Sequence, residues 1–257
     1  MRQLVEEDSV DVVKVVYSTI PGNVPRLGRD TLDAIIEEAH ILGRRVFAHV
    51  ATPEEAMECI ARGVDGIEHM VLGAPEALEP VFSAAAEQGV FWTPTLALFD
   101  KMAHDGDERY IEGYLPQGSV TRGVLESLRE PDAWWRKPDP SAPALPWSRT
   151  VELAGRAHRA GVRLAVGTDA GNPVVFHGLS AHRELELLVR AGLGTLEALA
   201  AGTTVAAAKM GVENRLGTVE PGKEGGPGPL ERQPDRRHTQ HTGHRSCREA
   251  RNTVQPC

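Results

Sequence analysis

The stretch Gly161-Val162-Arg163-Leu164-Ala165-Val166-Gly167-Thr168-Asp169-Ala170-Gly171 decides how the rest of the chain is interpreted. A short run of Val, Leu and Ala between glycines predicts a buried strand, which ends on a carboxylate followed by a loop that contains glycine. In sheets with helices on both sides, ligands gather at the carboxyl ends of the strands, so Asp169 lies where a metal or a general base is expected. The same pattern also fits an Asx turn or a helix cap.

Length and composition restrict the class of protein. With 257 residues, 41% of them hydrophobic, the chain can form one large α/β domain or two small ones. A net charge of -8 argues against a nucleic-acid partner, because phosphate contacts need a concentrated basic surface. No apolar run approaches the roughly 20 residues of a membrane span, and residues 1–8 are too acidic for a signal peptide, so we expect a soluble cytoplasmic protein without a membrane partner. Cys59 lies in a helical pattern and is expected in the core, and the cysteine spacing predicts no disulfides.

Strand and helix patterns alternate through the first hundred residues. The β-branched run at 10–17 is typical of strands buried on both faces of a parallel sheet. Asp30 is expected to cap a helix over 30–40, and Thr52 is expected to cap a helix over 53–61. Further strands are predicted at 45–50, 66–69 and 90–95, with a helix at 75–88. Four strand-helix units in a row predict a parallel α/β sheet.

The pattern changes between residues 98 and 146, which form a charged stretch with several prolines. Long insertions on regular scaffolds are often lids over a site, and the alternative is a surface excursion whose residues Trp134 and Trp135 pack against the outside of the domain. After this insertion, amphipathic helices are predicted at 149–159, 182–191 and 196–210.

Four polar residues occupy matching places in strands that otherwise consist of Val, Ile, Phe and Ala: Lys14, His49, His69 and Asp169. If the strands form a (β/α) barrel, their carboxyl ends converge at one mouth. Two imidazoles and a carboxylate are a normal ligand set for a divalent metal such as Zn²⁺, with an open position for a water molecule. A lysine could join them after carbamylation by CO₂. Each histidine alone also fits a hydrogen-bonded core residue, and the lysine alone fits a side chain that extends to solvent.

These segments resemble the amidohydrolase superfamily, in the branch with imidazolonepropionase-like and Xaa-Pro dipeptidase-like members. Segments 11–15, 47–50, 66–69 and 167–171 are similar to its fourth, fifth, sixth and eighth barrel strands, and the similarity continues through 184–192, 196–199 and 215–223. The resemblance implies a partial TIM-like (β/α) barrel made of strands 4 to 8 with their helices, in a domain of residues 1–223.

The resemblance also implies a chemistry for each matching residue. Lys14 is then the carbamylated bridge, His49 and His69 hold one metal ion, and Asp169 binds the other and acts as the base. The implied reaction is hydrolysis of a carbon-nitrogen bond in a small molecule such as a cyclic amide, an amidine or a dipeptide, with one or two ions, zinc first among them. His177 and His182 are weaker candidates for substrate contacts, with a loop position and a helix start as the alternatives. Glu68 is expected to be a surface residue.

The sequence departs from the family pattern at both ends. It contains no His-x-His pair and starts beside the fourth strand, which predicts an N-terminal truncation. Five strands cannot close an eight-stranded barrel, so we expect exposed edges that a second copy or another chain covers, and impaired activity. A non-catalytic remnant or partner-binding module and a metal-free protein that binds a small anion are the alternatives. A shifted reading frame after Glu224 would explain the Arg- and His-rich segment 225–257, and residues 224–257 are therefore expected to be a disordered, out-of-frame tail.

Overall fold

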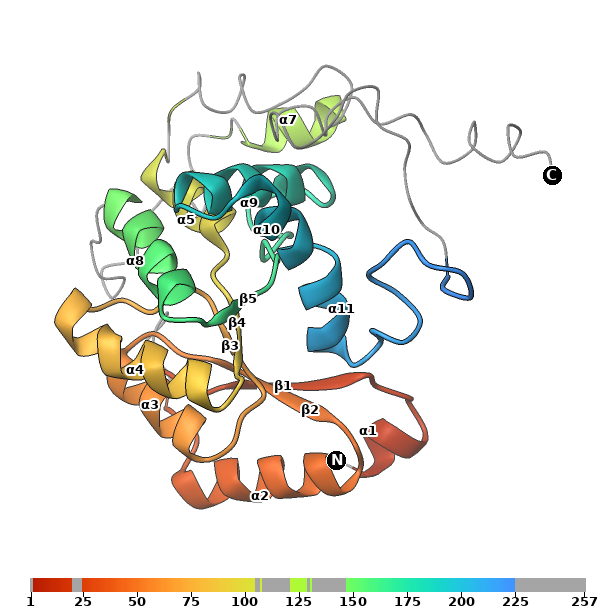
Figure 1. Cartoon of the computed structure of the whole chain (residues 1–257). Helices are drawn as coiled ribbons and strands as arrows, with labels where there is room; N and C mark the ends of the chain where they lie inside the picture. Colours follow the sequence, from red (N-terminus) through yellow and green to blue (C-terminus); the bar gives the residue numbers. More distant parts are fainter. Residues whose placement is uncertain are drawn as a thin grey trace.

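Five parallel strands form one sheet in the order in which they occur along the chain (Figure 1). The computed structural model describes residues 2–19, 25–104, 107, 121–128, 130 and 147–224. The strands are β1 (Val12–Val16), β2 (Arg45–His49), β3 (Gly66–Glu68), β4 (Phe91–Thr93) and β5 (Arg163–Leu164). Parallel strands that are neighbours both in sequence and in the sheet are joined by crossover connections on one face of the sheet, as in a TIM-like barrel. The expected partial barrel is confirmed.

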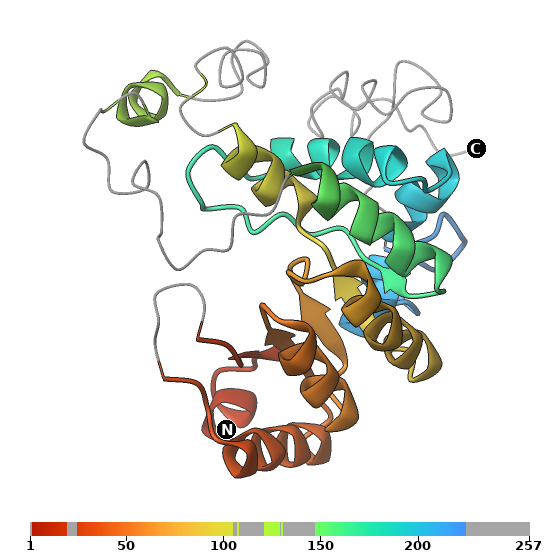
Figure 2. The same ribbon diagram turned by 90° about the vertical axis from the view of Figure 1, so that its left-hand side faces the viewer.

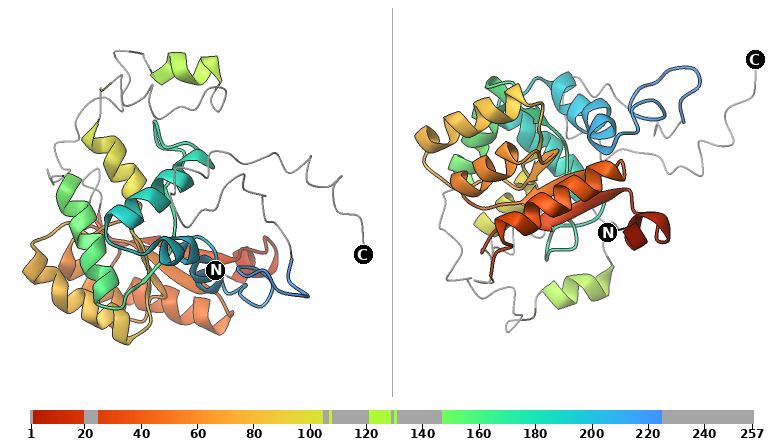
Figure 3. Two further views of the ribbon diagram at one scale, coloured as in Figure 1. Left: turned by 45° about the horizontal axis from the view of Figure 1, so that its top comes forward. Right: turned by 90° about the horizontal axis from the view of Figure 1, so that it is seen from below.

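Helices connect the strands and continue after the last one. They are α1 (Arg2–Glu6), α2 (Arg29–Ile41), α3 (Pro53–Ala61), α4 (Pro75–Glu87), α5 (Leu96–Ala103), α7 (Arg122–Leu128), α8 (Trp147–Arg159), α9 (Leu179–Arg190), α10 (Thr195–Ala201) and α11 (Thr204–Met210). Figure 2 shows α2, α3 and α4 beside one another along the same side of the strands. The two views in Figure 3 place α11 on the side of the strands away from α3 and α4.

The outer face of the sheet, which we define as the face toward α2, α3, α4 and α8, is apolar. Alternate strand residues point to this face and belong to one continuous core: Val15, Val46, Ala48, Ile67, Trp92 and Leu164. The helices contribute buried Leu, Ile, Val and Ala side chains to the same core, and Cys59 on α3 is fully buried there, as expected. Burial of this apolar surface is what holds the layers together.

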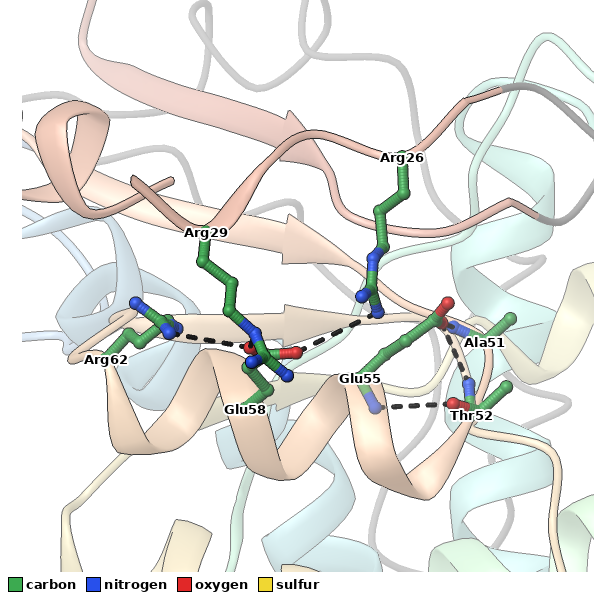
Figure 4. A network of polar contacts seen from close by, with 7 residues as sticks. All are labelled: Arg26, Arg29, Ala51, Thr52, Glu55, Glu58 and Arg62. Atoms are coloured by element: carbon green, nitrogen blue, oxygen red, sulfur yellow. Dashed lines mark hydrogen bonds and ion pairs between the residues drawn. The ribbon is translucent and has the colours of Figure 1, made fainter. Parts of the chain in front are cut away.

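A polar network joins the start of α2 to α3 (Figure 4). Thr52 and Glu55 form the capping box of α3, since Thr52 Oγ1 accepts from Glu55 N at 3.3 Å and Glu55 accepts from Thr52 N at 3.2 Å. Arg29 and Arg62 both form ion pairs with Glu58 from different directions. The cap predicted at Thr52 is confirmed.

Three predicted elements differ from the structure. Asp30 lies inside the first turn of α2 and Gly28 is the N-cap residue, so the predicted cap at Asp30 is wrong. The helix predicted over 196–210 is two helices, because α10 ends at Ala201 with Gly202 as its C-cap, and Thr203 has a non-helical backbone with φ -129° and ψ -86°. The strand predicted between Gly161 and Gly167 is reduced to Arg163–Leu164, and Val166 N donates instead to Ala201 O at 2.9 Å.

The insertion predicted from residue 98 starts later in the structure. Leu96–Ala103 is the regular helix α5, whose residues Leu96, Ala97 and Asp100 are buried. Much of the remaining insertion, Trp134 and Trp135 included, lies outside the described residues, as does the predicted tail from residue 225 onward. Among the described residues, no helix has both the length and the apolar character needed to cross a membrane.

Candidate metal site

The inner face of the sheet, opposite the outer face, is mostly polar and aromatic. The strand register places these residues on it: Val12, Lys14, Val16, Arg45, Phe47, His49, Gly66, Glu68, Phe91, Thr93 and Arg163. Gly66 leaves space for the Phe47 ring, because a Cβ at Gly66 would lie 2.8 Å from Phe47 Cδ1. Cations cover the two aromatic rings: Lys209 Nζ lies 4.5 Å from the centre of the Phe47 ring, and the Arg163 guanidinium lies 3.9 Å from that of Phe91.

Two of the four predicted ligands lie in direct contact at the carboxyl ends of β2 and β3. The ring centroids of His49 and His69 are 4.6 Å apart in an edge-to-face arrangement with an interplanar angle of 68°. His49 is the last residue of β2, and His69 follows β3 directly with a left-handed backbone at φ 71°. The topology therefore brings together two imidazoles that are twenty residues apart in the sequence.

The surroundings of His69 keep its ring neutral. Burial lowers the pKa of His69 to about 4, the positive charges of its neighbours act in the same direction, and the Asp169 carboxylate opposes them. Its Nδ1 lies 3.1 Å from Thr95 Oγ1, so Nε2 is the ring nitrogen that a ligand could use. A neutral imidazole with one nitrogen engaged by a protein group is the usual form of a metal-binding histidine.

Asp169 and Lys14 act electrostatically on His69. Asp169 has a left-handed backbone at φ 55°, and its Oδ2 accepts a hydrogen bond from Asn172 Nδ2 at 2.9 Å. Its charge and that of Lys14 both act on the pKa of His69. Lys14 is exposed on β1. It pairs with Phe47, which lies two residues before His49 on β2. Asp169 and Lys14 thus lie close enough to His69 to act on its pKa, while the two histidines are in ring contact.

The donor types fit a divalent metal, since neutral imidazoles and a carboxylate are ordinary ligands for Zn²⁺. Within the described ranges, no group of three or more His, Cys, Asp or Glu side chains lies in positions that could hold a metal ion. The assembled part of the site is therefore the pair of His49 and His69, and Asp169 has its carboxylate turned to Asn172.

His177 and His182, the candidates for substrate contacts, follow Asp169 in the chain. His177 is exposed in the loop before α9, and its carbonyl accepts from Leu179 N at 2.9 Å. His182 is half-buried within α9. Their roles in binding a substrate remain predictions.

Lys209, on α11, contacts the inner face of the sheet, and the sequence did not indicate this contact. Its Nζ lies 2.5 Å from Glu68 Oε1 and also donates to Thr93 Oγ1, so the prediction that Glu68 is a surface residue is wrong. Both side chains of this ion pair are nearly buried, at 11% and 12% exposure. Arg45 on β2 donates to the carbonyl oxygens of Ala208 and Lys209, the latter at 2.8 Å, which fixes the end of α11 over the inner face. Only the folded topology shows this contact, because 141 residues separate Lys209 from Glu68.

The fold and the site together define a barrel-type α/β protein with a histidine pair at the strand ends. The sequence matches the Amidohydrolase family over residues 6–225, and the chain therefore belongs to this family. No curated protein matches the sequence.

Solved structures support the same fold. A Xaa-Pro dipeptidase with bound methionine has a TM-score of 0.68 and 20% identity over 93% of this chain and 53% of its own. A Bifidobacterium longum protein assigned as a prolidase has a TM-score of 0.66 and 28% identity over 91% of this chain and 53% of its own. The ochratoxinase of A. niger has a TM-score of 0.66 and 22% identity over 92% of this chain and 48% of its own. The chain spans about half the length of these proteins.

Proposed function

We propose that this chain carries the metal-binding histidines and the general base of a zinc-dependent hydrolase that cleaves carbon-nitrogen bonds. The observation that supports this most strongly is the contact between His49 and His69 at the ends of adjacent strands, 4.6 Å between ring centroids, with Asp169 close enough to influence the pKa of His69. Membership of the amidohydrolase family supports the reaction class.

The residues of the chain have distinct roles in this proposal. His49 and His69 would hold the ion, and Lys14, once carbamylated, would add an anionic ligand from β1. A bound divalent ion polarises a carbonyl group and makes a water molecule acidic enough to attack near neutral pH. Asp169 would accept the proton from that water and pass it to the leaving nitrogen.

Peptide bonds to proline are the substrates to test first. One of the similar structures is a Xaa-Pro dipeptidase and another is assigned as a prolidase. Cyclic amides and amidines are the other substrates that the family resemblance implies. Localisation in the cytoplasm, where dipeptides are present, is part of the same proposal.

The test combines zinc content with turnover. The purified chain is expected to retain zinc after dialysis and to hydrolyse Xaa-Pro dipeptides. His49→Ala should lose both zinc and turnover, whereas His158→Ala, a surface histidine 3.5 Å from Glu197, should lose neither. Zinc-independent turnover would contradict the proposal.

A second candidate function is a non-catalytic, partner-binding half-barrel. The specific observation in its favour is that the described part of the chain holds no group of three metal donors in position. In this case the strands at the two edges of the sheet, β1 and β5, would pair with a second copy or with another chain. Zinc-free chains that form a defined oligomer and hydrolyse none of these substrates would favour this second function.

A further inference from the structure

His69 is held on three sides by groups from β4 and the residues that follow it. Its backbone N donates to Thr93 O at 2.8 Å, and its carbonyl accepts from Trp92 Nε1 at 2.8 Å. Its ring contacts Thr95 through Nδ1 at 3.1 Å. Because both backbone groups are fixed, the remaining chemical variable at His69 is which ring nitrogen carries the proton.

Thr95 adopts an uncommon conformation to make this contact. Its backbone is left-handed, with φ 49° and ψ 46°, which is unfavourable for a β-branched residue and needs support from its surroundings. Thr95 is also the N-cap residue of α5, yet its side chain makes no capping hydrogen bond. A threonine at this position normally turns its oxygen toward the first helical N–H groups.

Glu184 supplies the cap that Thr95 does not. From α9, its Oε1 accepts from Leu96 N at 2.9 Å and its Oε2 accepts from Ala97 N at 2.7 Å. Glu184 is fully buried, and each of its two carboxyl oxygens accepts one of these N–H groups. With the first N–H groups of α5 already satisfied, the Thr95 hydroxyl is available to His69.

We infer that Thr95 and Glu184 are positioning residues that select the Nδ1–H tautomer of His69, so that Nε2 presents its lone pair to a divalent metal. Nδ1–H donates to Thr95 Oγ1, and Glu184 fixes the two residues that directly follow Thr95. The metal-binding part of this inference rests on the proposed function, whereas the tautomer is a property of the metal-free chain. The opposite arrangement, in which the hydroxyl donates to Nδ1, would protonate Nε2 and prevent it from binding a metal.

The direct test is nuclear magnetic resonance of the metal-free chain with ¹⁵N-labelled histidine, at neutral pH. Long-range ¹H–¹⁵N correlations should show a protonated Nδ1 and an unprotonated Nε2 for His69. The reverse pattern in the unmodified chain would overturn the inference. This measurement does not depend on whether any variant folds.

Two variants at Thr95 separate positioning from simple stability. Thr95→Ser keeps the hydroxyl and should keep the Nδ1–H tautomer, whereas Thr95→Val should give a mixture of both tautomers. Glu184→Gln replaces one acceptor oxygen with an amide group and should shift the population in the same direction as Thr95→Val. An unchanged tautomer in a folded Thr95→Val chain would contradict the role of Thr95.

Zinc affinity, measured by calorimetry, gives the second readout. Loss of a hydrogen-bond partner of a metal-binding histidine typically weakens binding about 10- to 100-fold, so Thr95→Val should show a loss of this size and Thr95→Ser almost none. An equal loss in both variants would contradict the inference. If the unmodified chain binds no zinc, the proposed function fails, and the tautomer measurement still decides whether Thr95 orients His69.

Discussion

The two faces of the same sheet differ in the interactions that stabilise them. On the outer face, Ile67 and Trp92 are fully buried in a continuous apolar core. On the inner face, Glu68 and Thr93, the next residues along the same strands, contact Lys209 through an ion pair and a hydrogen bond. Side chains alternate between the two faces along each strand. The outer face therefore contributes to the free energy of unfolding in proportion to its buried apolar area, whereas the contribution of the inner face depends on individual polar contacts.

The difference separates stability from function in this chain. An apolar core tolerates small changes in side-chain shape, and the loss of stability grows with the number of buried methyl and methylene groups removed. A buried polar pair responds differently, because removal of one partner leaves the other desolvated and unpaired. The candidate metal ligands lie on or beside the inner face, where the sequence must preserve specific partners as well as hydrophobicity.

The largest expected effect is on the outer face. Ile67→Ala should lower the free energy of unfolding by about 3 kcal/mol, because it leaves a cavity between the sheet and the helices. Ile67→Val, which removes one methylene, should cost about 1 kcal/mol. Urea denaturation of both variants measures this. Equal costs for the two would show that the outer face is not packed as described.

The next effect concerns the ion pair on the inner face. Lys209→Met should lower the free energy of unfolding by about 2 kcal/mol, because Glu68 is left nearly buried without its cation. The matched variants are Glu68→Gln alone and the double variant of Lys209→Met with Glu68→Gln. The cost of the double variant should fall short of the sum of the single costs by about 1 kcal/mol. Additive costs would mean that the pair contributes nothing.

The outer face could be predicted from the sequence almost completely. Runs such as Arg45–His49 contain the β-branched and apolar residues of a buried strand, and the Thr52 cap with Glu55 marks the start of α3. The sequence pattern fails where tertiary contacts override it. Residues Val166 onward leave the sheet although their composition favours a strand, because Val166 bonds to the end of α10 instead of to a neighbouring strand.

The candidate site could be predicted only as a set of residue types at strand ends. His49 and His69 were identified because histidines are unusual in otherwise apolar strands, and the parallel topology brought them together. Thr95, Glu184 and Lys209 were not identified as contacts of the site. They come from elements distant in sequence, and neither a left-handed threonine nor a cap supplied from another helix has a local signature.

A smaller effect is expected in the pH dependence of stability. Burial raises the pKa of Glu184 to about 8 from its ordinary value of 4.5, against the effect of its two backbone donors. The folded chain therefore binds a proton more tightly than the unfolded chain, and this contribution is lost as the pH rises from 4.5 through 8. His69 acts with the opposite sign, since its lowered pKa reduces stability only as the pH falls below 6.5 toward 4.

Above pH 6.5, the effect of Glu184 on the free energy of unfolding should therefore be separable from that of His69. The free energy of unfolding should fall between pH 6.5 and pH 8, with a slope of at most about 1.4 kcal/mol per pH unit from this single group. Glu184→Gln cannot ionise and should flatten the profile in this range. Urea denaturation at a series of pH values provides the measurement. A profile that is identical in the unmodified chain and in Glu184→Gln would show that Glu184 does not titrate there.

The central claim is that the carboxyl ends of β2 and β3 present His49 and His69 together as a pair that binds a divalent metal. Titration of the metal-free chain with Co²⁺, followed by visible absorption, tests it most directly, because ligand-field bands report the donors themselves. We predict bands that saturate with added Co²⁺, weaken strongly in His49→Ala and in His69→Ala, and persist in His158→Ala. Bands of equal intensity in all three variants, or no bands in the unmodified chain, would contradict the claim.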